Sequence, residues 1–235
     1  MKVTVDQAFW DLFPTARITV MSLYGIDNTV DEAKDPYFKE LLDKGAKRAW
    51  EFIDEENYTQ SEFVQEWRQA FSKFKTKKGA RSSIEALLKR VHQGREFYPI
   101  NPLVDLYNSV SMAYALPCGG EDMDKLVGGL SLGQAKGGEP FFPLGAEEDA
   151  PALEGEIIYY DQEGAVCRCL NWREAQRTML TEDTKDAILV IEAINEEQVK
   201  RAQTAMQELK DLAKDYFGVE GRIYQLSAEH ASIEV

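Results

Sequence analysis

The side chain best suited to chemistry is Glu192, a carboxylate within the otherwise apolar segment Ile188 to Ile194. If this segment is a strand, alternation puts Glu192 on the same face as Ile188 and Val190. A carboxylate on an apolar face is costly unless it is paired or faces a cavity. Glu192 is therefore either a site residue or a strand-end residue that faces solvent or pairs with a buried arginine, and alternation alone leaves both interpretations open.

Amide and guanidinium groups gather between two expected strands, ahead of this segment. They are Asn171, Arg173, Gln176 and Arg177. Such groups bind phosphates or donate hydrogen bonds to an ester carbonyl. The alternative is a salt-bridged surface loop, because Glu174 lies among them. The clustering of four planar polar groups favours a site.

Further candidates surround the end of an expected helix. Gly120 and Glu121 follow Gly119 directly after that helix and could line a site, although a glycine pair is also a common helix stop. Asn108 lies off the apolar stripe of the helix, where it either points into a cleft or caps a loop. These positions therefore join the candidate list as substrate-binding residues.

Cysteine and histidine usage argues against a metal or a covalent nucleophile. The three cysteines, Cys118, Cys167 and Cys169, have only His92 and His230 as further soft ligands. That set is too small for an evident metal site, so three reduced thiols and no cofactor are expected. Neither histidine has a serine or cysteine at a spacing typical of a nucleophilic triad.

The net charge of −14 disfavours general binding to nucleic acid, because phosphate affinity comes mainly from lysine and arginine. The distribution is uneven. From Arg68 to Arg95 there are nine basic residues and one acid, so this window is +8 and the rest of the chain is −22. A local basic patch can hold one RNA segment, and the alternative is a solvated helix end. The candidate RNA-binding residues are Lys75, Lys77, Lys78 and Arg81.

Periodicity predicts an α+β fold with a largely antiparallel sheet. Ser82 and Glu85 have capping-box spacing, and Asn101 followed by Pro102 is a second helix start. Expected helices cover Tyr37–Phe52, Ser61–Phe74, Ser82–Gly94, a segment from Pro102 to before Pro117, and Glu196–Phe217. Expected strands cover Arg17–Leu23, Gly129–Ala135, Glu156–Asp161, Ala165–Asn171, Lys185–Ile194 and Arg222–Ser227.

The chain has no apolar stretch long enough for a membrane helix, and its first residues, Met1 to Phe13, lack the apolar core of a signal peptide. We therefore expect a cytoplasmic protein without a membrane partner.

Three segments, in order and spacing, resemble the B3/4 editing domain of the bacterial phenylalanyl-tRNA synthetase β subunit. They are Ile100–Asn108, Ala135–Pro140 with Pro143–Gly145, and Thr181–Thr184 leading into Ile188–Ala193. Freestanding B3/4 proteins are similar over Leu116–Asp122 and Cys169–Arg173 as well. The resemblance implies a layered β/β/α domain with an N-terminal helical portion. We expect one domain over 1–235, with a strand and helices in 1–80, the B3/4 core in 81–217, and a strand and tail in 218–235.

The resemblance also implies a function. The family domain hydrolyses tyrosine wrongly esterified to phenylalanine tRNA, and Glu192 matches the glutamate that meets the tyrosine hydroxyl. Glu192, Asn171 and Arg173 would then be catalytic. Asn108, Gly120, Glu121, Gln176 and Arg177 would bind substrate, and Lys75, Lys77, Lys78 and Arg81 would bind tRNA.

The partner implied by the resemblance is an aminoacylated tRNA rather than DNA, and a homodimer is allowed. Class II synthetase motifs are absent, so tRNA ligation is not expected. Gly119 stands where the synthetase has histidine, which puts the hydrolytic mechanism and the amino acid edited in question. The alternatives are a non-catalytic module that binds RNA or an amino acid, and an enzyme acting on another small ester or amide.

Overall fold

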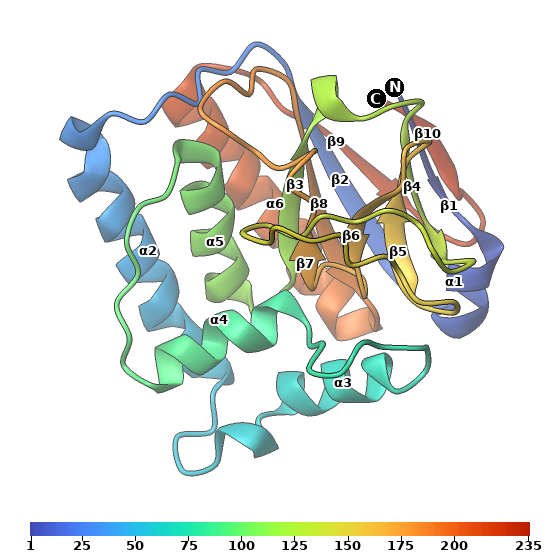
Figure 1. Ribbon diagram of the computed structural model, residues 1–235. Coiled ribbons are helices and arrows are strands. Elements are labelled where there is room, and N and C mark those ends of the chain that lie inside the picture. The colour runs from blue at the N-terminus through green and yellow to red at the C-terminus, as the bar shows by residue number, and fades with distance from the viewer.

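The computed structural model describes residues 1–235 as six α-helices and two β-sheets (Figure 1). The helices are α1 Gln7–Leu12, α2 Asp35–Ala49, α3 Glu62–Phe71, α4 Ser83–His92, α5 Pro102–Tyr114 and α6 Glu196–Phe217. The strands are β1 Lys2–Val5, β2 Arg17–Leu23, β3 Cys118–Asp122, β4 Leu130–Gln134, β5 Ile157–Tyr160, β6 Ala165–Arg168, β7 Arg173–Glu174, β8 Ala187–Ala193, β9 Arg222–Leu226 and β10 Ser232–Glu234. None of the helices is both long enough and apolar enough to span a membrane.

One sheet has the order β10-β1-β4-β5-β6-β7, and the other has the order β3-β8-β2-β9. All neighbouring strands are antiparallel except β1 and β4, which are parallel. Strand β8 lies inside the four-stranded sheet and is buried along its whole length, with β2 and β3 on either side. The predicted α+β class and the largely antiparallel pairing are therefore confirmed.

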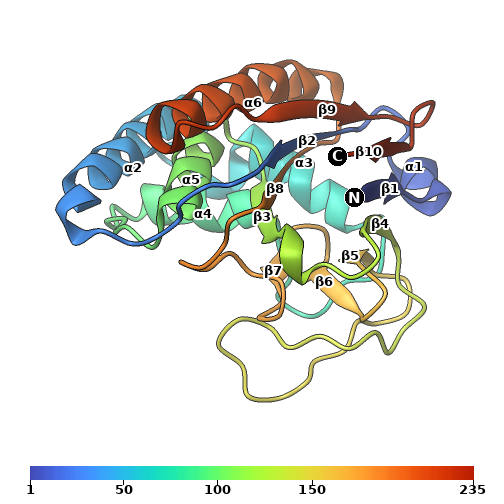
Figure 2. The same ribbon diagram turned by 90° about the horizontal axis from the view of Figure 1, so that it is seen from above.

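The two faces of β8 pack against different layers, as alternation requires. Leu189 and Ile191 pack with α5 and α6 in one apolar cluster. Ile188 and Val190 belong to a second cluster, which includes residues of the six-stranded sheet. The order of layers is therefore sheet, sheet and helices, and Figure 2 shows α6 lying across β2 and β9 on the outer side. The predicted layered β/β/α arrangement is confirmed.

Several predicted elements match closely. Strand β2 and helix α6 have the expected bounds, and α3 ends three residues earlier than expected. Asn101 caps α5 as predicted, because its side chain accepts a hydrogen bond from the Val104 amide at 3.1 Å. The hairpin of β5 and β6 also forms where the turn residues indicated.

The capping box predicted for α4 is wrong. The Ser82 side chain makes no capping hydrogen bond, and Glu85 is drawn away by Arg68, whose Nη2 lies 2.8 Å from the Glu85 carboxylate. The polar side of α5 also differs from expectation, because Asp105 and Ser109 are buried. Helix α5 packs on both α2 and α6, so little of its circumference reaches solvent.

Candidate functional site

A cavity of about 460 Å³ opens between α4, α5 and the segment that joins β6 to β8. Asn108, Asn171 and Arg173 all line it, so three of the predicted site residues meet there. Ile100 and Leu144 line it too and are each more than half exposed, which makes an apolar rim. Such a size, with a mostly apolar lining and a few polar groups, is typical of small-molecule sites.

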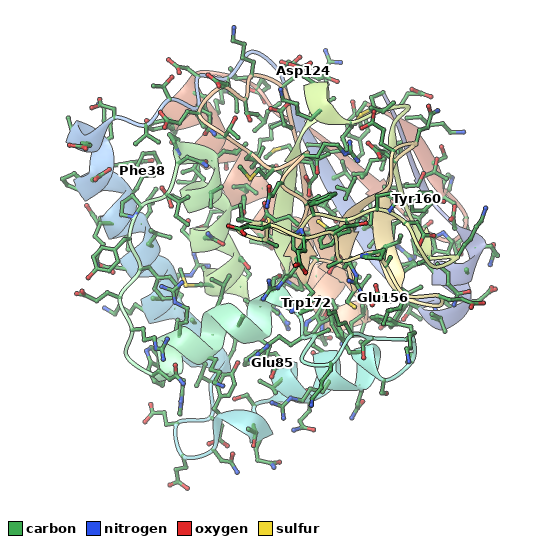
Figure 3. The ribbon with its side chains drawn as sticks, viewed as in Figure 1. Phe38, Glu85, Asp124, Glu156, Tyr160 and Trp172 are labelled. Carbon is green, nitrogen blue, oxygen red and sulfur yellow. The ribbon has the colours of Figure 1, made fainter.

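The aromatic side of the cavity is built by Trp172. In Figure 3 this side chain lies between α4 and the strands, and the Arg173 guanidinium sits over its ring at 5.3 Å. A guanidinium held over an indole keeps its N–H groups available for an acceptor in the cavity.

Asn171 is held in place by an unusual turn. Cys169 and Leu170 have φ values of 49° and 57°, a region that non-glycine residues seldom occupy. Two such residues in succession cost free energy, and strain of this kind gathers at functional sites. The turn places the Asn171 amide directly over Gly119. A Cβ added at Gly119 would lie 2.6 Å from both terminal atoms of Asn171, so Asn171 fills the space that a larger residue at position 119 would need.

A second, much smaller hollow of about 20 Å³ lies deeper, between the two sheets. Gly120 and Glu121 line it, which brings two more of the predicted residues to the site. Asn171 lines the hollow as well as the large cavity, so its side chain marks where the two spaces meet.

Glu121 is the acidic residue that lines this hollow, and Glu174, which lines the large cavity, lies near it. The pairing of Tyr159 with Cys167, and of Cys167 with Glu174, puts these three side chains on one face of their sheet. Glu121 projects towards them from β3, and the Cys167 thiol donates a hydrogen bond to Glu121 Oε1 at 3.1 Å. Burial, followed by the charge of Glu174, raises the pKa of Glu121 well above its usual value.

Glu192 lies on the inward face of β8 and is 2% exposed. Burial raises its pKa to about 8, and the nearby Tyr159 hydroxyl offsets part of this rise without forming a well-aligned hydrogen bond. Glu192 makes no ion pair and is not exposed, so neither alternative, pairing with a buried arginine or facing solvent at a strand end, holds. It does not line either space itself, but it lies beside Tyr159, which lines the hollow.

Two predicted residues are engaged elsewhere. The Gln176 amide donates to the backbone carbonyls of Pro143 and Ala146, at 2.9 and 2.7 Å, and so ties down that loop. Arg177 forms an ion pair with Asp161 at 2.7 Å. Neither residue lines the large cavity or the hollow.

The basic loop before α4 runs beside the Cys169 turn. Lys75, Lys77, Lys78 and Arg81 are exposed and form no ion pair. The Lys77 backbone lies against the Cys169 thiol, two residues before Asn171. Free positive charge is therefore available close to the segment that lines the cavity.

The family model described as the B3/4 domain matches residues 66–220, about two thirds of the chain. The chain belongs to this family. No curated protein matches it. Among solved structures it is similar to an N-terminal fragment of the phenylalanyl-tRNA synthetase β subunit from Pyrococcus horikoshii, with 14% identity and a TM-score of 0.45. The similarity covers 94% of this chain and 50% of that one, so the chain spans about half the length of the fragment.

The remaining candidate groups are the cysteines, the histidines and the acidic residues outside the site. No group of three or more histidine, cysteine or acidic side chains could hold a metal ion. Burial raises the pKa of Cys169 to about 12 and that of Cys167 well above its usual value, so neither thiol is a ready nucleophile.

Tyr107 and Glu174 line the large cavity, and Tyr159 and Cys167 line the hollow. Sequence reasoning did not name any of these four as site residues. The alternation within the β5–β6 hairpin could have placed Tyr159 and Cys167 on one face. Nothing in the local pattern indicated that this face meets Glu121 and Glu192 of the other sheet.

Proposed function

We propose that this B3/4 protein hydrolyses the ester bond of a mischarged aminoacyl-tRNA, with tyrosine on phenylalanine tRNA as the first substrate to test. The observation that carries the proposal is the meeting of Asn108, Asn171 and Arg173 in one cavity that joins a buried acidic hollow. Membership of the B3/4 family supports a function linked to tRNA.

In this proposal the terminal adenosine and the amino acid occupy the large cavity. The apolar rim at Ile100 and Leu144 offers a surface for the base. The Asn171 amide and the Arg173 guanidinium donate hydrogen bonds to the ester carbonyl oxygen as it gains negative charge.

The reaction needs no covalent intermediate on the protein. A water oxygen adds to the carbonyl carbon, and the bond from that carbon to the ribose oxygen then breaks. The products are the free amino acid, a tRNA with its terminal hydroxyl restored, and a proton that leaves to solvent. Glu192 lies on the buried side of the site and does not touch the substrate. It acts on the substrate indirectly, through the neighbouring Tyr159 hydroxyl, because Tyr159 lines the hollow.

The basic loop supports binding of the tRNA backbone. Lys75, Lys77 and Lys78 are exposed on the loop whose Lys77 backbone lies against the Cys169 thiol, and none forms an ion pair with an acid. Changing all three to alanine should weaken tRNA binding and reduce its salt dependence, by about 0.7 to 0.9 in logarithmic slope for each phosphate that is no longer neutralised by a lysine. An unchanged slope in a filter-binding assay would place the tRNA elsewhere.

The direct test is release of radiolabelled tyrosine from mischarged phenylalanine tRNA by the purified protein. We expect release well above the spontaneous rate and about a 100-fold loss with Asn171→Ala, because one aligned donor to an oxyanion is worth roughly that factor. The exposed Asn57→Ala is the matched control and should keep the full rate. If a panel of differently charged tRNAs all remain intact, the deacylase proposal is wrong.

A non-catalytic module is the second candidate, favoured by the charge of −22 outside the basic window and by Gly119 at the position where the synthetase has a histidine. Binding of uncharged and charged tRNA with equal affinity, without any release of amino acid, would support it.

A further inference from the structure

The hollow between the two sheets is the least explained feature of the interior. Its volume of about 20 Å³ is close to the space that one water-sized group requires. Its lining comes from both sheets and from the Asn171 turn, and consists of Gly119, Gly120, Glu121, Leu130, Tyr159, Cys167, Asn171 and Val190.

Polar atoms at this hollow lack partners. Glu121 and Tyr159 are both more than nine-tenths buried, yet Glu121 Oε2 and the Tyr159 hydroxyl have no hydrogen-bond partner in the protein. Glu192 Oε1, behind Tyr159, has none either. Buried polar groups in native proteins are nearly always satisfied, so Glu121 Oε2 and the Tyr159 hydroxyl, whose residues line the hollow, point to a small polar occupant.

The surrounding charge indicates the sign of that occupant. No lysine or arginine lies within ion-pair distance of Glu121, Glu174 or Glu192. The one positive charge that acts on the pKa of Glu121 is that of Arg177, and Arg177 already forms an ion pair with Asp161. A buried carboxylate without a cation is costly, so burial favours its protonated, neutral form, and a small positive group with several N–H donors would allow it to ionise.

We propose that the hollow accepts the protonated α-amino group of the aminoacyl ester, which rests on the proposed function. The amino group and the ester carbonyl of the substrate are close together, as are the hollow and the large cavity. The α-amino nitrogen is attached to the carbon next to the ester carbonyl, and Asn171 lines both the hollow and the large cavity. One molecule can therefore place its ammonium group beside Glu121 and Tyr159 while its carbonyl meets Asn171.

Proton release gives this proposal a distinctive readout. Burial raises the pKa of Glu121 and so favours its protonated form in the empty site, and an ammonium group arriving beside it should drive that proton off. Titratable and charged groups lie at or near the hollow on the strands and on the helix packed around it. They are Tyr107, Cys118, Glu121, Tyr159, Cys167, Glu174, Arg177 and Glu192.

The test uses stable amides in place of the ester, so that binding is measured without hydrolysis. L-Tyrosinamide, N-acetyl-L-tyrosinamide and 4-hydroxyphenyllactamide are titrated into the full chain at pH 7, in phosphate and in Tris. We expect tyrosinamide to bind at least tenfold more tightly than the other two, because hydrogen bonds to charged groups are worth that much. Its binding heat should differ between the two buffers, because each released proton is taken up by the buffer and phosphate and Tris have different heats of protonation. Equal binding of the acetylated amide, or no binding of tyrosinamide, overturns the proposal.

Variants separate this inference from the deacylase proposal. Glu121→Gln and Tyr159→Phe should each reduce the preference for tyrosinamide over its acetylated form, whereas the exposed Glu147→Gln should not. Retained preference in both variants, with folding confirmed by near-ultraviolet circular dichroism, overturns the assignment. Tyrosinamide preference without tRNA deacylation would refute the enzyme and keep the amine site, and deacylation without that preference would do the reverse.

Discussion

The buried carboxylate of Glu192 should make the stability of the protein depend on pH. Its pKa is about 8 in the folded protein, against an ordinary value of 4.5. The folded state therefore binds more protons than the unfolded state between about pH 4.5 and 8, and the free energy of unfolding falls as the pH rises through that window. Below and above the window Glu192 contributes no slope.

The size of the effect follows from the two pKa values. A tenfold change in proton affinity is about 1.4 kcal/mol, so the difference between 4.5 and about 8 corresponds to about 5 kcal/mol across the window. Glutamine has nearly the shape of a protonated glutamate and does not titrate. The Glu192→Gln variant should therefore match the wild type near pH 5 and exceed its stability by up to about 5 kcal/mol at pH 9.

The assay is urea denaturation of both proteins at intervals from pH 5 to pH 9. Glu121 and Glu174, whose pKa values are also raised, give both proteins a common slope, so the difference between the curves isolates Glu192. The exposed Glu147→Gln serves as the control for a charge change at the surface. Parallel curves for wild type and Glu192→Gln would refute the assignment of a buried, unpaired carboxylate at this position.

Three further predictions concern packing and geometry. Arg168→Ala should lower the free energy of unfolding by about 3 to 5 kcal/mol in urea, because it leaves the fully buried Glu156 without its partner, and a loss below about 1 kcal/mol would contradict this. Gly119→Ala should displace the Asn171 amide, because the new Cβ would lie 2.6 Å from the terminal atoms of Asn171, and should therefore reduce kcat for deacylation. An unchanged kcat would show that catalysis does not need the Asn171 amide in this position. Asn101→Ala should destabilise the fold by about 1 kcal/mol by removing the cap of α5, and unaltered thermal unfolding would rule that cap out as a source of stability.

Strongly periodic segments were predictable because their own residues decide their structure. The apolar face of α6 repeats at helical spacing over 22 residues, and Asn195 with Gly218 marks its ends. The β-branched alternation of β2 likewise set its bounds without reference to any partner. Elements of this kind need only local propensity and one buried face.

Strand β3 was missed, because Gly119 and Gly120 have low strand propensity and look like a helix stop. Pairing with β8 makes this segment a strand, and that pairing is invisible in the local pattern. Glycine is required at position 120 by close packing, since a Cβ there would collide with the Leu189 side chain.

By itself, the amino-acid sequence determined that Glu192 lies in an apolar strand segment, that amides and guanidinium groups gather before that strand, and that a net positive charge of +8 is concentrated from Arg68 to Arg95. Only the tertiary structure decided that Tyr159 lies beside Glu192 and lines the hollow, and that Arg177 forms an ion pair with Asp161. The reason is that a side chain's partners across two facing sheets depend on how distant segments pack, whereas its own strand sets only the face on which it lies.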